Sequence, residues 1–254
     1  MNGSLKVVAM IPARYASTRF PAKMLAPLAG KPVIVRTYEN IVSTKLFDEV
    51  YVIADDQRIV DAMLAHGYSC LMSKKQHETG SDRIAEAAQD IDCDIIVNVQ
   101  GDEPFTSKEP LEKLLSVFNA ADADMIDMAT LMQKMDDEEH IVDPNYVKVI
   151  KDKNDFAIYF SRSPIPYPRA TGATYYEHVG VYAFRKQALL DFTNWEQLEN
   201  ELSEKVECIR YLEYGKKIKM VETDFLGVEI DTPEDLINAE KLLLEREKAG
   251  KAKV

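Results

Sequence analysis

The strongest constraint on the fold is a regular alternation of strand and helix patterns through the first half of the chain. Residues 5–11 (LKVVAMI), 49–54 (EVYVIA) and 94–99 (DIIVNV) are almost continuously apolar, as strands buried on both faces are. Segments with apolar side chains at helical spacing lie between and after them, near residues 32–42, 59–64, 81–88 and 111–118. This alternation predicts an α/β fold with a mostly parallel, twisted sheet flanked by helices.

The pattern changes near Asp127. Short strand-like runs follow at 128–132, 146–151, 156–161 and 175–184, and prolines interrupt the chain at 164, 166 and 168. These runs indicate a smaller antiparallel section at roughly residues 127–190, at a sheet edge or in a dimer contact. We expect this section to lie within a single domain of residues 1–254.

Three helix starts can be read from the sequence. Pro32 stands where the first turn of a helix is expected, and Ser81 can cap another helix. Thr232, Pro233 and Asp235 form an N-cap, a first-turn proline and an N3 acid, which predict the start of the last helix.

The charge balance limits the possible functions. The 254 residues include 43 acids and 31 bases, a net charge of −12. A surface of this sign repels nucleic acid, although a locally basic site can still bind a small anion. Three scattered cysteines fit neither a disulfide framework nor a zinc site, which favours a reducing, cytoplasmic location. No apolar run approaches the ~20 residues that span a bilayer, so no membrane insertion is expected.

Basic residues concentrate in the loop after the first predicted strand. The segment IPARYASTRFPAKMLAPLAGKP contains Arg14, Arg19, Lys23 and Lys31. Ligands bind beyond the carboxyl ends of strands in open α/β sheets, and bases with free backbone N–H groups there suit a polyphosphate. The loop matches neither the P-loop nor the dinucleotide-binding glycine pattern. A solvated basic loop is the alternative interpretation.

Acids follow two other predicted strands. Asp102 lies in NVQGDEP (98–104), and carboxylates at a strand end can hold Mg²⁺. Asp231 lies in GVEIDTPEDL (227–236) and could be a second ligand, although that segment alone favours an ordinary acid before a helix. The four histidines lack metal-ligand spacing; His178 is a candidate pocket residue, and a lone strand histidine is more often structural.

Taken in order, the motifs resemble those of the 3-deoxy-manno-octulosonate (KDO) cytidylyltransferases, the CMP-KDO synthetase family. The matching segments are IPARYASTRFPAK (11–23), VIADDQRI (52–59), HETGSDRIAE (77–86), VNVQGDEP (97–104), MATL (128–131), VKVI (147–150), AIYFSRSPIPY (157–167), HVGVYAFR (178–185), RYLEYGKKI (210–218) and IDTPEDL (230–236). They run in family order over nearly the whole chain.

The resemblance implies an activity and a site. It implies a Mg²⁺-dependent nucleotidyltransferase of nucleotide-diphospho-sugar transferase type that makes CMP-KDO and pyrophosphate from CTP and KDO, for lipopolysaccharide or capsule synthesis. It also implies a homodimer built partly by the later strands. The residues that carry over are Arg14, Arg19 and Lys23 for the CTP phosphates, Asp82, Arg83 and Gln100 beside the nucleotide or sugar, Asp102 and Asp231 for magnesium, and Arg162, His178, Tyr182 and Glu207 for the sugar acid.

The chain departs from the family pattern at three positions. Ala22 replaces a glycine, Ala54 replaces a threonine, and Cys208 replaces a glutamine expected at the sugar. Cysteine is a weak hydrogen-bonding group, so the acceptor could instead be 8-amino-KDO or a neuraminate-like acid. Ala22 and Ala54 also motivate a third hypothesis, an inactive nucleotide-binding scaffold.

The sequence suggests a mechanism that depends on positioning and charge. We expect one Mg²⁺ on Asp102 and Asp231 and a second on the triphosphate beside Arg19 and Lys23. No side chain is predicted as a general base.

Overall fold

The computed structural model describes residues 5–17, 19–77, 79–224 and 228–251, the last six of these by their backbone alone. The chain divides into two compact units. Unit 1 comprises Met1–Cys93, Asn98–Ser107 and Leu226–Val254, and unit 2 comprises Asp94–Val97 and Lys108–Phe225. A single domain of residues 1–254, with dimerisation through residues 127–190, stays a prediction.

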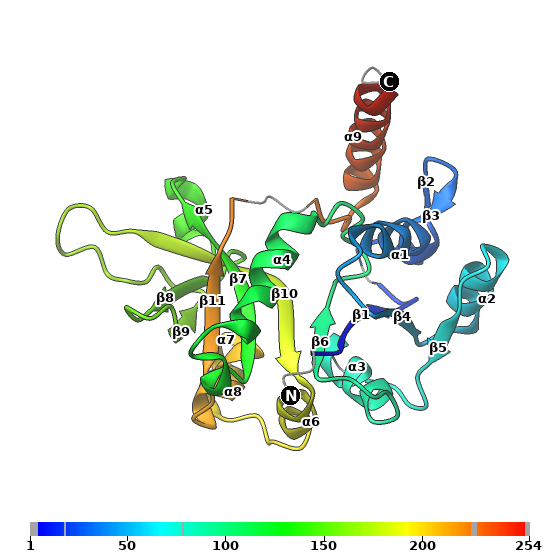
Figure 1. The fold of residues 1–254 in the computed structure, drawn as a ribbon. Helices are drawn as coiled ribbons and strands as arrows, with labels where there is room; N and C mark the ends of the chain where they lie inside the picture. Colours follow the sequence, from blue (N-terminus) through cyan, green and yellow to red (C-terminus); the bar gives the residue numbers. More distant parts are fainter. Residues whose placement is uncertain (1–4, 18, 78, 225–227, 252–254) are drawn as a thin grey trace. The chain divides into compact units, whose positions relative to one another are not determined.

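Unit 1 is built on three parallel strands, β1 (Val7–Ala13), β4 (Glu49–Ala54) and β5 (Cys70–Met72). Val8 pairs with Glu49 and Ala13 with Ala54, while Val52 pairs with Cys70. The helices between them are α1 (Val33–Thr44) and α2 (Gln57–Ala65), and α3 (Gly80–Ala88) follows β5 (Figure 1). Parallel strands joined through helices confirm the predicted α/β class.

The segment that follows β1 packs against the C-terminal segment within unit 1. The 3₁₀ turn η1 (Lys23–Leu25) leads into the hairpin β2 (Pro27–Leu28) and β3 (Lys31–Pro32), and the C-terminal helix is α9 (Pro233–Lys251). Leu28, Phe105, Ile230 and Ala239 share one buried apolar cluster, with further apolar side chains around it. This cluster fixes the segment before α9 against the loops that follow β1 and β6.

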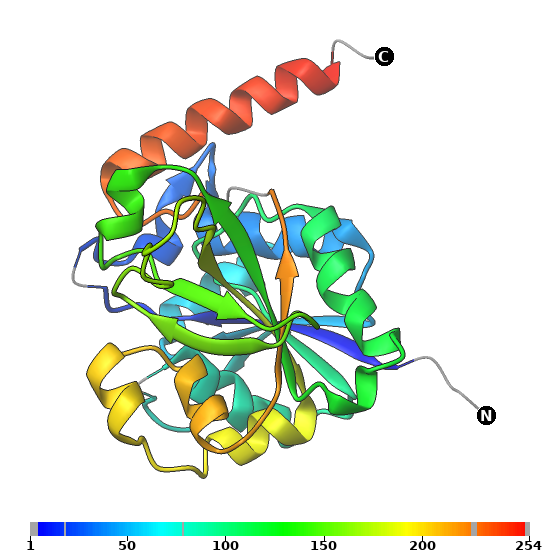
Figure 2. The same cartoon turned by 90° about the vertical axis from the view of Figure 1, so that its left-hand side faces the viewer.

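Unit 2 contains the antiparallel pairs that the sequence predicts. Its strands are β6 (Ile95–Asn98, of which the residues up to Val97 belong to unit 2), β7 (Met128–Met135), β8 (Lys148–Lys151), β9 (Ala157–Ser161), β10 (Tyr175–Arg185) and β11 (Ile218–Glu222). β10 pairs antiparallel with β7 and β8, β9 pairs antiparallel with β8, and β11 pairs parallel with β7. In Figure 2, β11 (orange) lies beside the green β7.

Short helices complete unit 2. They are α4 (Lys108–Ser116), η2 (Val117–Asn119), η3 (Ala123–Met125), α5 (Glu138–Val142), α6 (Lys186–Phe192), α7 (Glu199–Glu204) and α8 (Cys208–Glu213). A buried ion pair joins α7 to α8: Glu201 accepts two hydrogen bonds of 2.6 Å from the Arg210 guanidinium. Phe192 of α6 lies under the same guanidinium, 4.0 Å from its carbon.

Two predicted helix starts are wrong by one or two residues. Pro32 ends β3 and is the N-cap of α1 rather than its first residue. The N-cap of α3 is Thr79 rather than Ser81, because the Thr79 hydroxyl accepts the Asp82 N–H at 3.1 Å. Thr232 does open α9 as predicted: its hydroxyl donates to Asp235 at 2.8 Å and accepts the Asp235 N–H at 3.2 Å.

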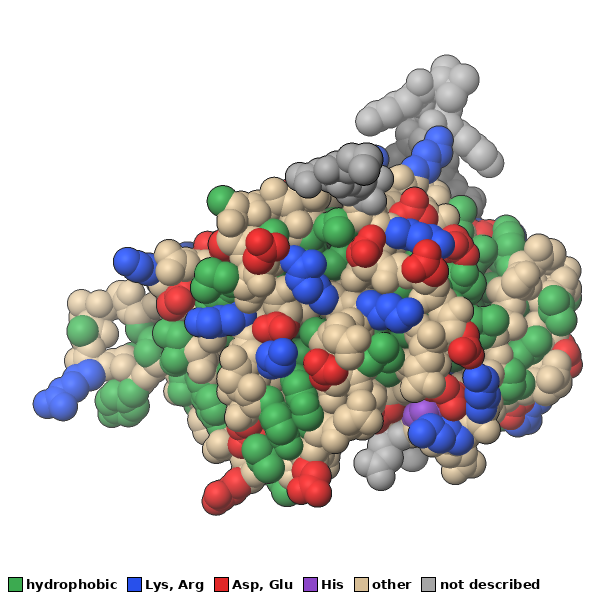
Figure 3. Space-filling model, turned by 60° about the horizontal axis from the view of Figure 1, so that its bottom comes forward, with side chains coloured by type: hydrophobic (Ala, Val, Ile, Leu, Met, Phe, Trp, Pro, Cys, Tyr) green, Lys and Arg blue, Asp and Glu red, His purple; other side chains and the backbone are tan. Residues whose placement is uncertain are grey.

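Two surface properties of the described residues bear on the excluded functions. Within that part of the chain, every helix is too short or too polar to cross a membrane. On the face shown in Figure 3, acidic and basic side chains are intermixed, with smaller groups of hydrophobic side chains between them.

Candidate active site

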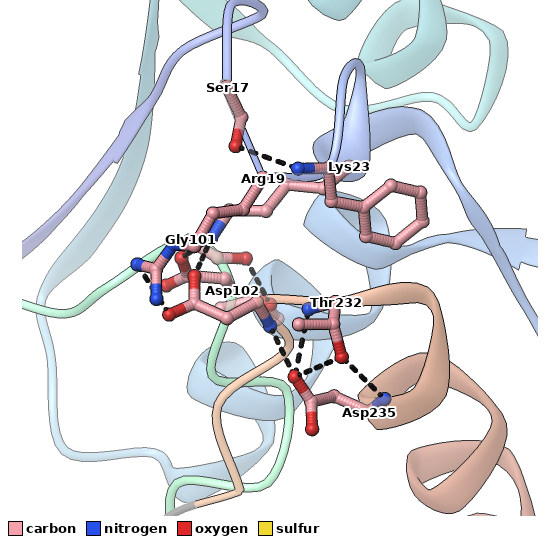
Figure 4. Close-up of polar contacts among 10 residues, drawn as sticks. Ser17, Arg19, Lys23, Gly101, Asp102, Thr232 and Asp235 are labelled. Carbon is pink, nitrogen blue, oxygen red and sulfur yellow. Dashed lines mark hydrogen bonds and ion pairs between the residues drawn. The ribbon is translucent and has the colours of Figure 1, made fainter.

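The basic loop and the two predicted metal-binding acids meet in unit 1. The Lys23 ammonium donates to Asp231 Oδ1 at 2.7 Å and forms an ion pair with Asp102. Arg19 Nη2 lies 2.7 Å from Asp231 Oδ2. Figure 4 shows Arg19 and Lys23, which come from one loop, close to Asp102, which comes from another. Two bases predicted for phosphate and two acids predicted for metal therefore form one ion-pair network.

Local backbone geometry brings these segments together. Ala22, just before Lys23, adopts a left-handed conformation with φ of 58°. Gly101, just before Asp102, packs so closely that a Cβ there would lie 3.0 Å from the Pro12 carbonyl oxygen. A larger residue at 101 would therefore push the loop that carries Asp102 away from the end of β1.

The C-terminal segment is held by backbone contacts on both sides of Asp231. The Ile230 N–H donates to the Asp102 carbonyl at 3.0 Å. The Asp235 carboxylate accepts the N–H groups of Asp231 at 3.1 Å and of Thr232 at 2.8 Å. The predicted segment 227–236 begins at Gly227, which lies outside the described residues. The cap of α9 thus also orients the carboxylate that receives Lys23 and Arg19.

Lys23 is a buried cation. Only 4% of the residue is exposed. Burial by itself would lower the pKa of Lys23, but the Asp102 and Asp231 carboxylates outweigh that effect and raise it. Lys23 is therefore charged at neutral pH, whereas the side chain of Arg19 is 69% exposed and can turn toward solvent.

The sequence analysis missed a third carboxylate, Glu229. One oxygen each from Asp102, Glu229 and Asp231 lies within 4.8 Å of the other two, a set that could hold a metal ion. Burial, followed by the charges of Asp102 and Asp231, raises the pKa of Glu229 to about 7. The spacing could have revealed it: side chains two apart in an extended segment share a face, which places Glu229 beside Asp231.

Glu103 adds a fourth acid next to the cluster. Burial, and then the charges of Asp102 and Glu229, raises the pKa of Glu103 to about 8. At neutral pH this side chain is mostly protonated, so it adds little negative charge to the site.

A hollow of about 440 Å³ in unit 1 contains two of the predicted nucleotide-binding residues, Arg14 and Arg83. Arg83 Nη2 lies 3.1 Å from Asp55, and among the described residues Arg83 Nε is buried without a hydrogen-bond partner. Burial lowers the pKa of Arg83 despite the opposing effect of Asp55. The hollow therefore offers a buried cationic donor to an anionic or carbonyl-bearing ligand.

Sequence reasoning also missed part of the wall of this hollow. Arg58 lies over the Tyr15 ring at 3.4 Å and is bonded to Asp56, and the Tyr15 N–H donates to Asp55 at 2.9 Å. The motif VIADDQRI contains three of these residues, but a motif alone does not show which side chains line a cavity.

Two other charged residues of the motifs have contacts outside this ion-pair network, and Gln100 completes the predicted site residues of unit 1. Asp82 accepts the Thr79 hydroxyl at 2.8 Å, in the cap of α3. Lys31, the fourth base of the loop, pairs with Glu39 at 2.7 Å, away from the acids. Gln100 is half-buried in the loop directly before Gly101.

Three of the predicted sugar-acid residues lie near one another in unit 2. The His178 Nε2 atom is 3.1 Å from the Thr130 hydroxyl and 3.8 Å from Cys208 Sγ. The Tyr182 ring centre is 5.5 Å from that of His178, and Glu207 is the N-cap residue of α8, next to Cys208. Burial lowers the pKa of His178 to about 4 and raises that of Cys208. His178 is therefore a neutral hydrogen-bonding group at pH 7.

Arg162, the fourth predicted sugar-acid residue, is engaged elsewhere in unit 2. Its guanidinium donates to the carbonyl oxygens of Glu204 and Pro144 at 2.7 Å each, and of Lys205 at 3.3 Å. These contacts tie the end of α7 to the loop before β8, which is a positioning role.

Together the parallel α/β unit, its strand-end arginine and lysine side chains and its carboxylate cluster define a nucleotide-handling transferase. Residues 8–218 match the sequence model of the family described as cytidylyltransferase. The chain belongs to this cytidylyltransferase family, which confirms the resemblance seen in the motifs.

Full-length relatives agree. The chain is 58% identical over 240 residues to the 3-deoxy-manno-octulosonate cytidylyltransferase of Christiangramia forsetii, covering 94% of this chain and 97% of that one. It is 56% identical over 241 residues to the protein of the same name from Flavobacterium johnsoniae, covering 94% and 99%.

Solved structures show the same fold. CMP:2-keto-3-deoxy-manno-octonic acid synthetase complexed with CTP is 35% identical, with a TM-score of 0.89 over 95% of this chain and 99% of that one. The 4-diphosphocytidyl-2C-methyl-D-erythritol synthase of Anaerococcus prevotii is 17% identical, with a TM-score of 0.62 over 94% and 98%, a likeness of fold alone.

Proposed function

We propose that this enzyme transfers CMP from CTP to the anomeric hydroxyl of KDO and releases pyrophosphate. The observation that carries the proposal is the convergence of Arg19 and Lys23 with Asp102 and Asp231 in a chain 58% identical to a KDO cytidylyltransferase. The names of the quoted relatives favour none of the alternatives, which are 8-amino-KDO, a neuraminate-like acceptor and an inactive scaffold.

In this mechanism the bases of the first loop act on the triphosphate. Arg14, Arg19 and Lys23 would bind its oxygens and neutralise the charge that develops on the pyrophosphate leaving group. The buried Arg83 of the 440 Å³ hollow would hold the nucleotide through its unpartnered Nε. Such contacts orient the α-phosphate for in-line attack.

The carboxylates fit a magnesium ion. Mg²⁺ prefers oxygen ligands and is usually held by one or two carboxylates together with substrate phosphates. Asp102 and Asp231 would hold it, and their oxygens lie close enough to share one ion. When bound, Mg²⁺ supplies Lewis-acid polarisation of the phosphoryl oxygens and of the attacking hydroxyl.

The acceptor residues are assigned to unit 2. The neutral His178 imidazole and the Tyr182 hydroxyl would hydrogen-bond hydroxyl groups of the sugar, with Glu207 beside them. Arg162 would support them indirectly, since carbonyl oxygens occupy its guanidinium.

Pyrophosphate release tests the proposal. CTP and Mg²⁺ are supplied with KDO present or omitted, and KDO-dependent release is the expected result. Asp102→Asn should lower turnover about 100-fold or more, because it removes a carboxylate on which several kcal/mol of charge stabilisation depend. Asp90→Asn, at a surface pair with Lys74, is the matched control and should keep wild-type turnover.

Two results would refute the proposal. If the protein binds CTP but releases no pyrophosphate when KDO is present, KDO is rejected as the acceptor. A panel of other sugar acids would then distinguish an enzyme with another acceptor from an inactive protein. Near-normal turnover of Asp102→Asn at saturating Mg²⁺ would reject the metal assignment.

We propose further that the enzyme is a cytoplasmic homodimer whose product feeds lipopolysaccharide or capsule synthesis. Exposed apolar side chains in unit 2 support a subunit contact there: Tyr167 is 83% exposed and Ile158 is 55% exposed. Light scattering should give twice the chain mass, and a double serine substitution at these positions should give the monomer mass.

A further inference from the structure

The side chains assigned to phosphate are bonded to the side chains assigned to metal. Lys23 contacts one oxygen of Asp102 and one of Asp231, and Arg19 contacts the other Asp231 oxygen. The Lys23 ammonium thus lies between the same two carboxylates that would hold a magnesium ion. One buried position cannot accommodate both an ammonium and a divalent cation, because like charges repel strongly where water is excluded.

We propose that Lys23 and Arg19 are exchangeable counter-ions, which neutralise the carboxylates until a nucleotide triphosphate draws them away and so opens the site to the metal. This inference rests on the proposed function, since it requires a triphosphate ligand. Metal and nucleotide then bind cooperatively, and each raises the affinity for the other by the same factor.

Glu229 strengthens the coupling. One oxygen each from Asp102, Glu229 and Asp231 lies within 4.8 Å of the other two. Among the ion pairs of the described residues, those of Lys23 and Arg19 supply the positive charge near these carboxyl groups. When both bases turn to the phosphates, the carboxylates face one another. A divalent cation compensates such a cluster better than any monovalent group in the same position.

The two bases differ in how they can move. Arg19 is largely in solvent, so it can change partners by rotation of its side chain. Lys23 is enclosed, but it follows the left-handed turn at Ala22 and has a flexible four-carbon stem. Arg19 should therefore exchange readily, while Lys23 controls whether the metal position is open.

The test is Mn²⁺ binding in the absence of nucleotide, monitored through the electron paramagnetic resonance signal of free Mn²⁺. Omitting nucleotide avoids chelation of the metal by the triphosphate. Lys23→Met should tighten Mn²⁺ binding at least 10-fold, and Arg19→Met about 3-fold. Adding Glu229→Gln to Lys23→Met should reverse most of the gain. Lys31→Met is the matched control, since Lys31 pairs with Glu39 outside the cluster, and it should bind Mn²⁺ as the wild type does.

Unchanged or weaker Mn²⁺ binding by folded Lys23→Met would overturn the proposal, and would show that Lys23 is a permanent structural partner of the carboxylates. If Lys23→Met does not fold, Arg19→Met decides, because its exposed side chain can be removed with little structural cost: unchanged binding there overturns the proposal. Failure of the proposed function is seen separately, as absent KDO-dependent pyrophosphate release by the wild type. KDO-dependent release together with unchanged Mn²⁺ binding in both variants would reject the exchange alone.

Discussion

The neutral state of His178 leads to a stability prediction that can be worked out quantitatively. Burial lowers the pKa of this imidazole to about 4, from an ordinary value of 6.5. Above pH 6.5 the ring is neutral in both the folded and the unfolded chain, so it adds no pH dependence. Below pH 6.5 the unfolded chain binds a proton that the folded chain binds only near pH 4. Acid therefore favours unfolding across this window.

The size of the effect follows from the two pKa values. The linkage relation gives a loss of about 2 kcal/mol of unfolding free energy between pH 7.5 and pH 5, and about 3 kcal/mol by pH 4. His178→Gln has no titrating ring and should lack this contribution. The wild type should therefore lose about 2 kcal/mol more than the variant between pH 7.5 and pH 5.

Two measurements check the prediction. Urea unfolding at pH 7.5, 6 and 5 gives the difference between wild type and His178→Gln. Proton NMR of the ring resonances gives the pKa of His178 directly, and the variant identifies its signal among the four histidines. A ring that titrates near 6.5, or parallel pH curves for the two proteins, would refute the argument from burial.

Three further substitutions probe backbone strain, a buried ion pair and a helix cap, each measured by urea unfolding. Ala22→Gly should stabilise the protein by about 1 kcal/mol, since φ of 58° disfavours a residue with a Cβ, and a loss of stability would show that the turn is unstrained. Arg210→Met should cost about 3–5 kcal/mol, because Glu201 is only 2% exposed and would lose its buried partner; a cost below about 1 kcal/mol would contradict this. Thr232→Ala should cost about 1 kcal/mol through the cap of α9 and also weaken Mn²⁺ binding by freeing Asp231, whereas unchanged metal binding would mean that the cap does not orient it.

The sequence was most informative where a strand is buried on both faces. The predicted strands 5–11 and 94–99 overlap β1 and β6, whose residues are almost all buried, because a continuous apolar run is the pattern that such strands leave in a sequence. Helix starts were less well predicted. Thr79 and Ser81 are both able to cap α3, and the choice depends on which hydroxyl meets the N–H of Asp82.

The candidate site was predictable in its members but not in their pairing. Acids and bases at strand ends identified Arg19, Lys23, Asp102 and Asp231. Their spacing in the chain could not show that Lys23 binds both acids, since that depends on how the loops pack. Glu229 was missed because a single acid near a helix is common. Whether Arg162 faces a ligand or backbone carbonyls likewise depends on tertiary contacts that motifs do not encode.

The ion pair between Lys23 and Asp231 joins residues 208 positions apart. At typical rates of protein synthesis, about 10–40 s pass between the appearance of the two residues. In the later part of that interval, once Asp102 has been made, the nascent chain has Lys23 and Asp102 but still lacks Asp231. Ribosome-bound intermediates that lack Asp231 should therefore be unable to bind metal at this site, and protection of the N-terminal loop against proteases should rise only after Asp231 has left the ribosome.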